Sequence, residues 1–253
     1  MKTTGIIDKI NLWHKVYQRI RFFRKMYPLS AIFADFFLFP FDYFFSNRSI
    51  KTVRNLTVAI THRCNISCQM CYFKGNLGKS PNLELEKYKF IIDSVRSAHP
   101  CVILSGGEPF LHPHLIDMVG YAKDAGLAVQ VFTNGTLVNP DYAAALVKKG
   151  LDYINFSLLG NENSHVVVTN VQHSYRKLIN NLEYFAQHRG STKVVLNFTI
   201  TPQAFKDIGH AIELAKRYNL DGLRIQHYNY LLPQEFNEQK RVIKKIFGMD
   251  STT

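Results

Sequence analysis

From residue 56 onward, short apolar runs alternate with longer amphipathic runs, and this alternation limits the fold more than any other feature of the chain. Such a pattern is typical of parallel sheets whose strands are joined by helices. It predicts strands at residues 56–61, 101–104, 127–133, 152–158, 193–201 and 222–228. It predicts helices at residues 83–97, 115–125, 140–149, 174–188 and 204–218. The expected fold class is α/β with one strand in each repeating unit.

Two of the predicted strands alternate strictly between apolar and polar residues. The fourth strand places Asn155 and Ser157 on the face opposite its apolar residues. The fifth strand does the same with Asn197, Thr199 and Thr201. A parallel sheet that is packed on both faces reads as continuously apolar, so helices should cover only one face of this sheet. We therefore expect the polar face to enclose a cavity that holds a ligand or water, and not a packed core.

Three cysteines, Cys64, Cys68 and Cys71, lie within eight residues just after the first predicted strand. Three thiolates this close in the chain can be presented to one inorganic centre. A structural zinc site normally takes four protein ligands. An iron–sulfur cube usually takes four thiolates, so three would leave one iron open. A three-cysteine zinc knuckle or a set of buried thiols is the alternative interpretation. The fourth cysteine, Cys101, opens the second strand and is interpreted as a small buried hydrophobe.

The Cys-x3-Cys-x2-Cys spacing resembles that of the radical S-adenosylmethionine (SAM) enzymes. Gly106–Pro109 (Gly-Gly-Glu-Pro) and Thr133–Thr136 (Thr-Asn-Gly-Thr) follow the second and third strands, as in that family. The motif style is closest to the SPASM-type group. The resemblance implies a partial (β/α)6 barrel and a [4Fe–4S] cluster held by Cys64, Cys68 and Cys71. It also implies reductive cleavage of SAM to a 5′-deoxyadenosyl radical, which abstracts hydrogen from a substrate.

The resemblance further implies residues that bind SAM. Gly106, Gly107 and Glu108 match the segment that binds the amino group of the cofactor in the family. Ser157 matches a position that contacts the ribose or the carboxylate. Two consecutive glycines also let the backbone approach a ligand closely.

Three further candidates, Thr133, Asn134 and Gln226, lie at the carboxyl ends of predicted strands, where barrel enzymes build their active sites. Related enzymes pair the SAM carboxylate with an arginine, and this chain has Thr169 at the matching position. We predict that Arg224 replaces it, because a guanidinium binds a carboxylate in bidentate fashion. The alternative is that Arg224 pairs with a surface acid. We interpret His165 as a local hydrogen-bonding residue in preference to a catalytic base.

We divide the chain into an appendage at residues 1–54, a barrel at 55–230 and a helical tail at 231–253. SPASM-type relatives carry a C-terminal domain whose cysteines bind auxiliary clusters, and no cysteine follows Cys101 here. The chain is therefore expected to be either a fragment or a single-cluster enzyme.

The predicted appendage is basic and rich in aromatic residues. Residues 1–54 hold ten Lys or Arg against three Asp, a net charge of +7 out of +12 for the whole chain. The apolar run at residues 29–45 is interrupted by Asp35, Pro40 and Asp42, and it is too short for a spanning helix. It suits a helix that lies in an anionic membrane interface. The alternatives are packing against the open side of the barrel and a solvated basic helix; nucleic acid is not favoured.

The cysteine content argues against a disulfide framework, and the N-terminus lacks the pattern of a secretory signal. We expect a cytoplasmic protein, peripheral to the inner face of the membrane. The expected partners are an electron donor of the flavodoxin or ferredoxin type and a peptide, lipid or small-molecule substrate. The competing functional class is a zinc- or nucleic-acid-binding protein on a barrel scaffold, without SAM chemistry.

Overall fold

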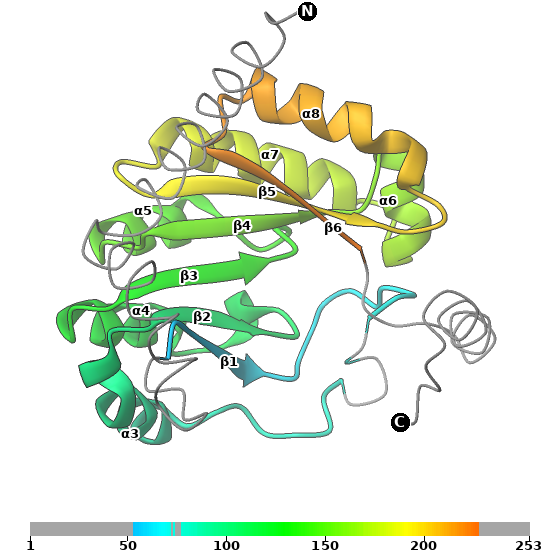
Figure 1. Ribbon diagram of the computed structural model, residues 1–253. Helices are drawn as coiled ribbons and strands as arrows, with labels where there is room; N and C mark the ends of the chain where they lie inside the picture. Colours follow the sequence, from blue (N-terminus) through cyan, green and yellow to red (C-terminus); the bar gives the residue numbers. More distant parts are fainter. Residues whose placement is uncertain (1–52, 72, 74–76, 228–253) are drawn as a thin grey trace, which may run out of the picture. The chain divides into compact units, whose positions relative to one another are not determined.

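The computed structural model describes residues 53–71, 73 and 77–227, and these residues contain one six-stranded sheet (Figure 1). All neighbouring strands are parallel and are paired in chain order, so the first and last strands form the two edges. This arrangement confirms the predicted six-stranded α/β architecture. The strands are β1 (Asn55–Thr61), β2 (Cys101–Gly106), β3 (Ala128–Thr133), β4 (Tyr153–Leu158), β5 (Lys193–Ile200) and β6 (Gly222–His227).

The described sheet belongs to the second of two units of the chain, residues 54–253. The predicted tail at residues 231–253 lies outside the described residues. So does the predicted appendage, apart from Val53 and Arg54.

Six helices among the described residues connect or flank the strands: α3 (Leu85–Val95), α4 (Leu115–Asp124), α5 (Pro140–Lys148), α6 (Glu162–Thr169), α7 (Ser174–His188) and α8 (Ile208–Arg217). Three short 3₁₀ turns are η2 (Arg96–Ala98), η3 (Pro109–Leu111) and η4 (Phe205–Asp207). The predicted ranges overlap every helix except α6. None of the helices among the described residues has the length and apolarity needed to span a membrane.

Helix α6 was not predicted from the sequence. Its run of three valines lowers helix propensity, because β-branched side chains lose rotamer freedom in a helix. Two asparagines stabilise the ends of the helix and so offset this cost. The side chain of Asn161 caps the start of the helix by accepting a hydrogen bond from the Ser164 N–H at 3.0 Å. Asn170 ends it in the left-handed conformation, at φ 56°.

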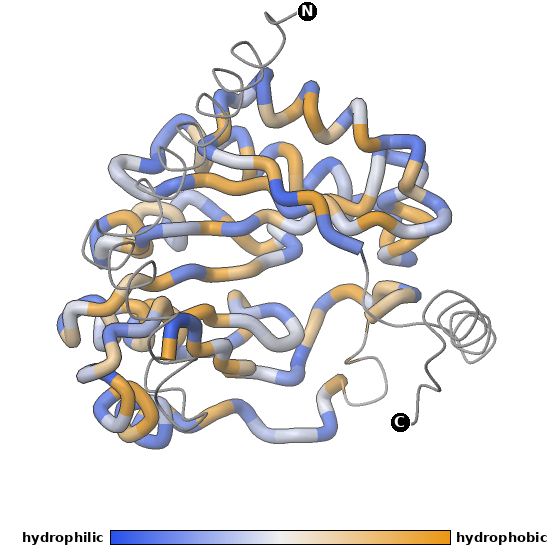
Figure 2. The backbone as a smooth tube through the Cα atoms, viewed as in Figure 1, coloured by the Kyte–Doolittle hydropathy of each residue, from blue (hydrophilic) through white to orange (hydrophobic). Residues whose placement is uncertain are grey.

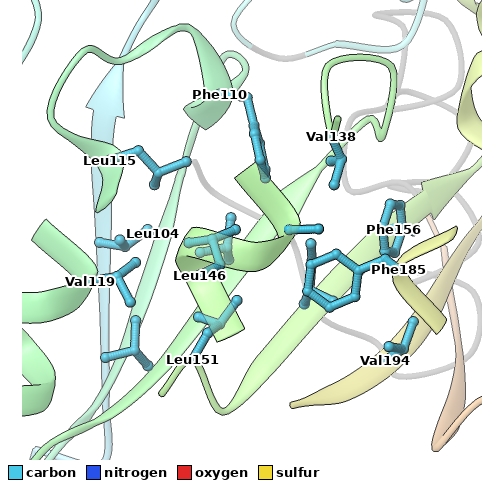
Figure 3. Close-up of a cluster of buried hydrophobic side chains, with 14 of the residues drawn as sticks. Leu104, Phe110, Leu115, Val119, Val138, Leu146, Leu151, Phe156, Phe185 and Val194 are labelled. Carbon is cyan, nitrogen blue, oxygen red and sulfur yellow. The ribbon is translucent and has the colours of Figure 1, made fainter. Parts of the chain in front are cut away.

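The hydrophobic core lies between the helices and one face of the sheet. Figure 3 shows Leu104 of β2 and Phe156 of β4 in one cluster with Val119 of α4, Leu146 of α5 and Phe185 of α7. The rings of Phe156 and Phe185 meet edge to face with centroids 6.1 Å apart. Polar and apolar residues are mixed along the strands (Figure 2), as expected when only one face of a sheet is packed by helices.

The inner face of the sheet is closed at one end and open at the other. Toward the amino ends of the strands, the Gln130 carboxamide donates to the Cys101 sulfur at 3.1 Å and accepts from Asn155 at 3.4 Å. All three residues are buried, so this half is packed. The cavity expected on the polar face occupies only the half at the carboxyl ends. Cys101 is buried, as predicted.

Candidate active site

A cavity of about 540 Å³ is lined by residues at the carboxyl ends of the strands and by the loop that carries the three cysteines. Figure 1 shows that this loop leaves the sheet at the carboxyl end of β1. The residues predicted from the sequence that line the cavity are Cys64, Cys68, Cys71, Gly106, Gly107, Thr133, Asn134, Ser157 and Gln226. The rest of its lining consists of Ile66, Met70, Phe73, Ser105, Phe132, Leu159, His165, Asn197, Thr199 and His227. Loops that are far apart in the sequence therefore meet at one site, at the end of the barrel where such sites are usually built.

The two glycines after β2 lie against the backbone of the segment that leads from β1 into the cysteine loop. The Gly107 N–H donates to the Thr61 carbonyl at 2.8 Å, and the next N–H, of Glu108, donates to the Arg63 carbonyl at 2.8 Å. A Cβ atom on Gly106 would overlap the carbonyl oxygen of Thr61, and one on Gly107 would overlap that of Arg63. Gly106 also has φ +130°, a conformation that favours glycine. The glycines thus allow two backbones to touch just before the first cysteine.

The Glu108 side chain is fully buried and does not line the cavity. Its carboxylate accepts hydrogen bonds from the Thr133 hydroxyl at 2.8 Å, the Asn134 N–H at 2.8 Å and the Phe110 N–H at 3.2 Å. Burial raises the pKa of this carboxyl to about 7, and the three hydrogen bonds act in the opposite direction. Glu108 therefore joins the loop after β2 to the loop after β3.

The loop after β3 is in turn joined to the cysteine loop. The Asn134 carboxamide donates to the Asn65 side chain at 2.9 Å, and Asn65 donates to the Thr136 hydroxyl at 2.7 Å. Asn134 also donates to the sulfur of Cys64 at 3.9 Å. A hydrogen bond to a sulfur ligand is one way in which a protein tunes an iron–sulfur cluster.

Helix α6 borders the cysteine loop on another side. The backbone N–H of Gln69 donates to the Val168 carbonyl at 2.9 Å, and its side chain donates to the Val167 carbonyl at 3.2 Å. Gln69 lies between the second and third cysteines. The last turn of α6 is thereby fixed against the centre of that loop.

Burial raises the pKa of the Cys64 thiol, and it raises that of Cys68 to about 12, with smaller contributions from the neighbouring thiols. These two thiols are therefore protonated at neutral pH until a metal displaces their protons. No group of three or more His, Cys, Asp or Glu side chains among the described residues is arranged around a single ion. An iron–sulfur cube is held by thiolates, and three cysteines that line one cavity would supply three of its four ligands.

His165 of α6 is 2% exposed and lines the cavity. Its Nδ1 accepts a hydrogen bond from the Leu159 N–H at 3.2 Å, and its ring meets Tyr175 edge to face at 5.8 Å. Burial lowers the pKa of His165 to about 4, so the ring is neutral at pH 7. The contact with Leu159 confirms the predicted local hydrogen bond, and the position on the cavity wall was not predicted.

Arg224 is not brought to the cavity wall. It is paired in register with Asn197, and its guanidinium lies 5.5 Å from the centre of the Phe132 ring, a cation–π contact. Phe132 lines the cavity and Arg224 does not. Gln226, two residues further along β6, does line it and donates to Thr199 at 3.4 Å.

Asn197 lines the cavity and is 3% exposed, and its Oδ1 has no hydrogen-bond partner among the described residues. Such an atom is uncommon in folded proteins, but it is itself buried, as is the unpaired Oδ1 of Asn155 in the packed half. The alternation of β5 placed Asn197 on the polar face from sequence alone. The same alternation in β3 places Phe132 on that face, although it was not identified there.

In comparisons with known proteins, residues 58–215 match the model of the Radical SAM superfamily. The chain is 30% identical over 173 residues to the Fe-coproporphyrin III synthase of Methanosarcina barkeri, a match that covers 68% of this chain and 43% of that protein. It is 29% identical over 178 residues to a probable GTP 3′,8-cyclase of Methanopyrus kandleri, covering 70% and 56% respectively. The chain spans about half of the length of the curated relatives it matches.

Several solved structures share the fold, and two of them hold S-adenosylmethionine. SuiB of Streptococcus suis bound to S-adenosylmethionine superposes with a TM-score of 0.65 at 14% identity, over 80% of this chain and 50% of that one. The structure of anSMEcpe with bound AdoMet gives a TM-score of 0.59 at 15% identity, over 79% of this chain and 68% of that one. At such low identity these matches establish the fold alone.

Proposed function

The chain belongs to the radical SAM superfamily, and from that membership we propose that it cleaves SAM reductively at a [4Fe–4S] cluster held by Cys64, Cys68 and Cys71. The observation that carries the proposal is the meeting of these three cysteines with the loops after β2, β3 and β4 around one cavity. Members of the superfamily use both a [4Fe–4S] cluster and SAM. This reading is favoured over a zinc- or nucleic-acid-binding protein.

The donor set suits a cluster that leaves one iron free for SAM. When bound, the cluster supplies the electron that converts SAM to methionine and a 5′-deoxyadenosyl radical, which takes hydrogen from a substrate. We propose a donor of the flavodoxin or ferredoxin type for that electron.

The chain's own residues would hold SAM and position the cluster. We propose that Gly106, Gly107, Thr133, Ser157 and Gln226 contact SAM, because all five line the cavity with the cysteines. Glu108 would act by fixing Thr133 and Asn134, to both of which it is hydrogen-bonded. Asn134 would tune the cluster through Cys64.

For the substrate, we propose a molecule whose part inside the cavity is uncharged, such as a peptide segment or a neutral small molecule. The described part of the lining includes no Lys or Arg to neutralise a further anion beside the carboxylate of SAM. It offers instead carboxamides and hydroxyls, which suit a neutral group with hydrogen-bond donors and acceptors.

Anaerobic reconstitution with iron and sulfide tests the central proposal. The protein should bind about four irons and form 5′-deoxyadenosine from SAM under dithionite. Replacing Cys64, Cys68 or Cys71 with Ser should abolish both, while Cys101→Ser, whose residue lies in the packed half of the barrel, should retain both. One bound zinc and no cleavage product would overturn the proposal.

We also propose that residues 1–54 bind an anionic membrane surface, on the strength of their net charge of +7 and their aromatic content. Each basic residue near such a surface contributes about 1 kcal/mol, and the contribution falls with salt. Liposome flotation should show binding that requires anionic lipid, weakens in high salt and is lost when residues 1–54 are deleted. If the deleted protein is insoluble and without iron, the segment is part of the core and the proposal fails.

A further inference from the structure

We propose that His165 donates a hydrogen bond from Nε2 to the carboxylate of bound SAM. The inference rests on the proposed SAM-binding function and assigns a binding residue within that site.

The first support is the position of the helix that carries His165. Two hydrogen bonds from Gln69 fix the last turn of α6 against the cysteine loop, at 2.9 and 3.2 Å. His165 lies on this short helix and lines the same cavity as the cysteines. A SAM molecule next to the cysteine loop would therefore lie next to His165.

The second support is the tautomer of the ring. Nδ1 accepts a hydrogen bond from the Leu159 N–H, so in the neutral ring the proton is on Nε2. Nε2 has no hydrogen-bond partner among the described residues. The ring thus presents an unused N–H donor, held in a fixed orientation by the backbone of Leu159.

The third support is the scarcity of cations at the site. The described part of the cavity lining has no Lys or Arg, and the Arg224 guanidinium lies against the ring of Phe132 instead. The hydroxyl of Thr169, on the same helix, donates to the carbonyl of His165 at 2.7 Å and is fully buried. A carboxylate that entered this cavity would need neutral donors, since an unpaired buried charge is costly. His165 Nε2 and the Ser157 hydroxyl are the side-chain donors that we assign.

Two substitutions separate binding from a structural role. His165→Asn places an acceptor where Nδ1 was, so it keeps the bond to Leu159, but it is too short to reach the cavity. His165→Gln extends an N–H donor toward the position of Nε2 and gives up the acceptor for Leu159. The test compares the dissociation constants of SAM and decarboxylated SAM for the reconstituted wild-type protein and both variants.

The wild-type protein should prefer SAM, partly because the carboxylate would also bind the open iron of the proposed cluster. His165→Asn should reduce that preference about tenfold, as for the loss of a hydrogen bond to a charged group. His165→Gln should retain most of the preference. Arg224→Ala, as a control, should leave the preference unchanged, and iron content is measured for every variant.

The result that would overturn the inference is an equal loss of affinity for both ligands in His165→Asn, because the carboxylate would then not be the group that the ring contacts. A preference that survives in His165→Asn and is lost in His165→Gln or Arg224→Ala would also overturn it. Failure of the wild-type protein to bind SAM at all would instead refute the proposed function.

Discussion

Some residues shape the site by contacts other than those that face the cavity. Glu108 is the main example, because its buried carboxylate accepts three hydrogen bonds from two different loops. Gly107 is another kind of example. It lines the cavity, yet its missing side chain matters on the other side, where its backbone meets the Arg63 carbonyl. At the scale of single residues, the site depends on contacts between loops as much as on groups that face a ligand.

Glu108 should make stability depend on pH in a specific direction. Its pKa in the folded protein, about 7, lies above the ordinary value of 4.5, so folding favours the protonated form. That contribution is fully present below about pH 4.5 and is lost as the pH rises through about 7. Urea unfolding should show wild type losing up to about 3 kcal/mol relative to Glu108→Gln between these limits. Parallel pH profiles of the two proteins would contradict the assignment.

Gly107→Ala should disrupt the entry to the cysteine loop. Its Cβ would overlap the backbone of Arg63, which cannot move without shifting the loop, and overpacking of this kind costs about 1–3 kcal/mol. We expect less iron to be retained after reconstitution. Gly209→Ala is a matched control, since a Cβ there meets nothing within 4 Å. Equal iron retention in the two variants would show that the contact with Arg63 is unimportant.

At the scale of elements, α6 is the helix that the sequence did not predict, and it contributes His165 to the cavity wall. Its start is capped by Asn161, whose N–H and carboxamide both donate to Asp207 at 3.0 Å. Its end is fixed by Gln69 of the cysteine loop. A short helix attached at both ends can hold His165 in one place.

Asn161→Ala should therefore affect both stability and ligand binding. Loss of the cap should cost about 1–2 kcal/mol, and SAM affinity should fall because His165 is no longer held. Asn139→Ala removes a similar cap from α5, where the side chain accepts from the Tyr142 N–H at 2.8 Å, and α5 contributes no residue to the cavity wall. The control should lose similar stability and keep its SAM affinity, as measured by urea unfolding and equilibrium dialysis. A similar loss of affinity in both would contradict the account of α6.

The sequence predicted the elements whose pattern is local. The β/α alternation located every strand, because each strand's apolar run is short and each following helix is amphipathic. It did not predict α6, because the run of three valines disfavours a helix and the asparagines at its two ends were not recognised as helix caps. It could not place Glu108 and Arg224, because the partners of each, Thr133 and Phe132, are distant in the sequence. The sequence pattern predicts which residues lie at the carboxyl ends of the strands. Only the structure shows which of their side chains face the cavity.

At the scale of the whole described unit, the inner face of the sheet is divided into two halves. The amino-end half is filled by Cys101, Gln130 and Asn155, and Gln130 is hydrogen-bonded to each of the other two. The carboxyl-end half is open and is lined by the cysteines together with polar groups such as Asn197. The packed half supports the sheet, and the open half is where SAM and a substrate would meet.

The central claim is that three cysteines hold a cluster whose free iron binds SAM in this cavity. Electron paramagnetic resonance of the reconstituted, dithionite-reduced protein, recorded before and after SAM is added, tests that claim most directly. We predict a signal from the reduced cluster that changes when SAM is added, and no such signal in Cys64→Ser. A cluster signal that is identical with and without SAM, or one that survives in Cys64→Ser, would contradict the account.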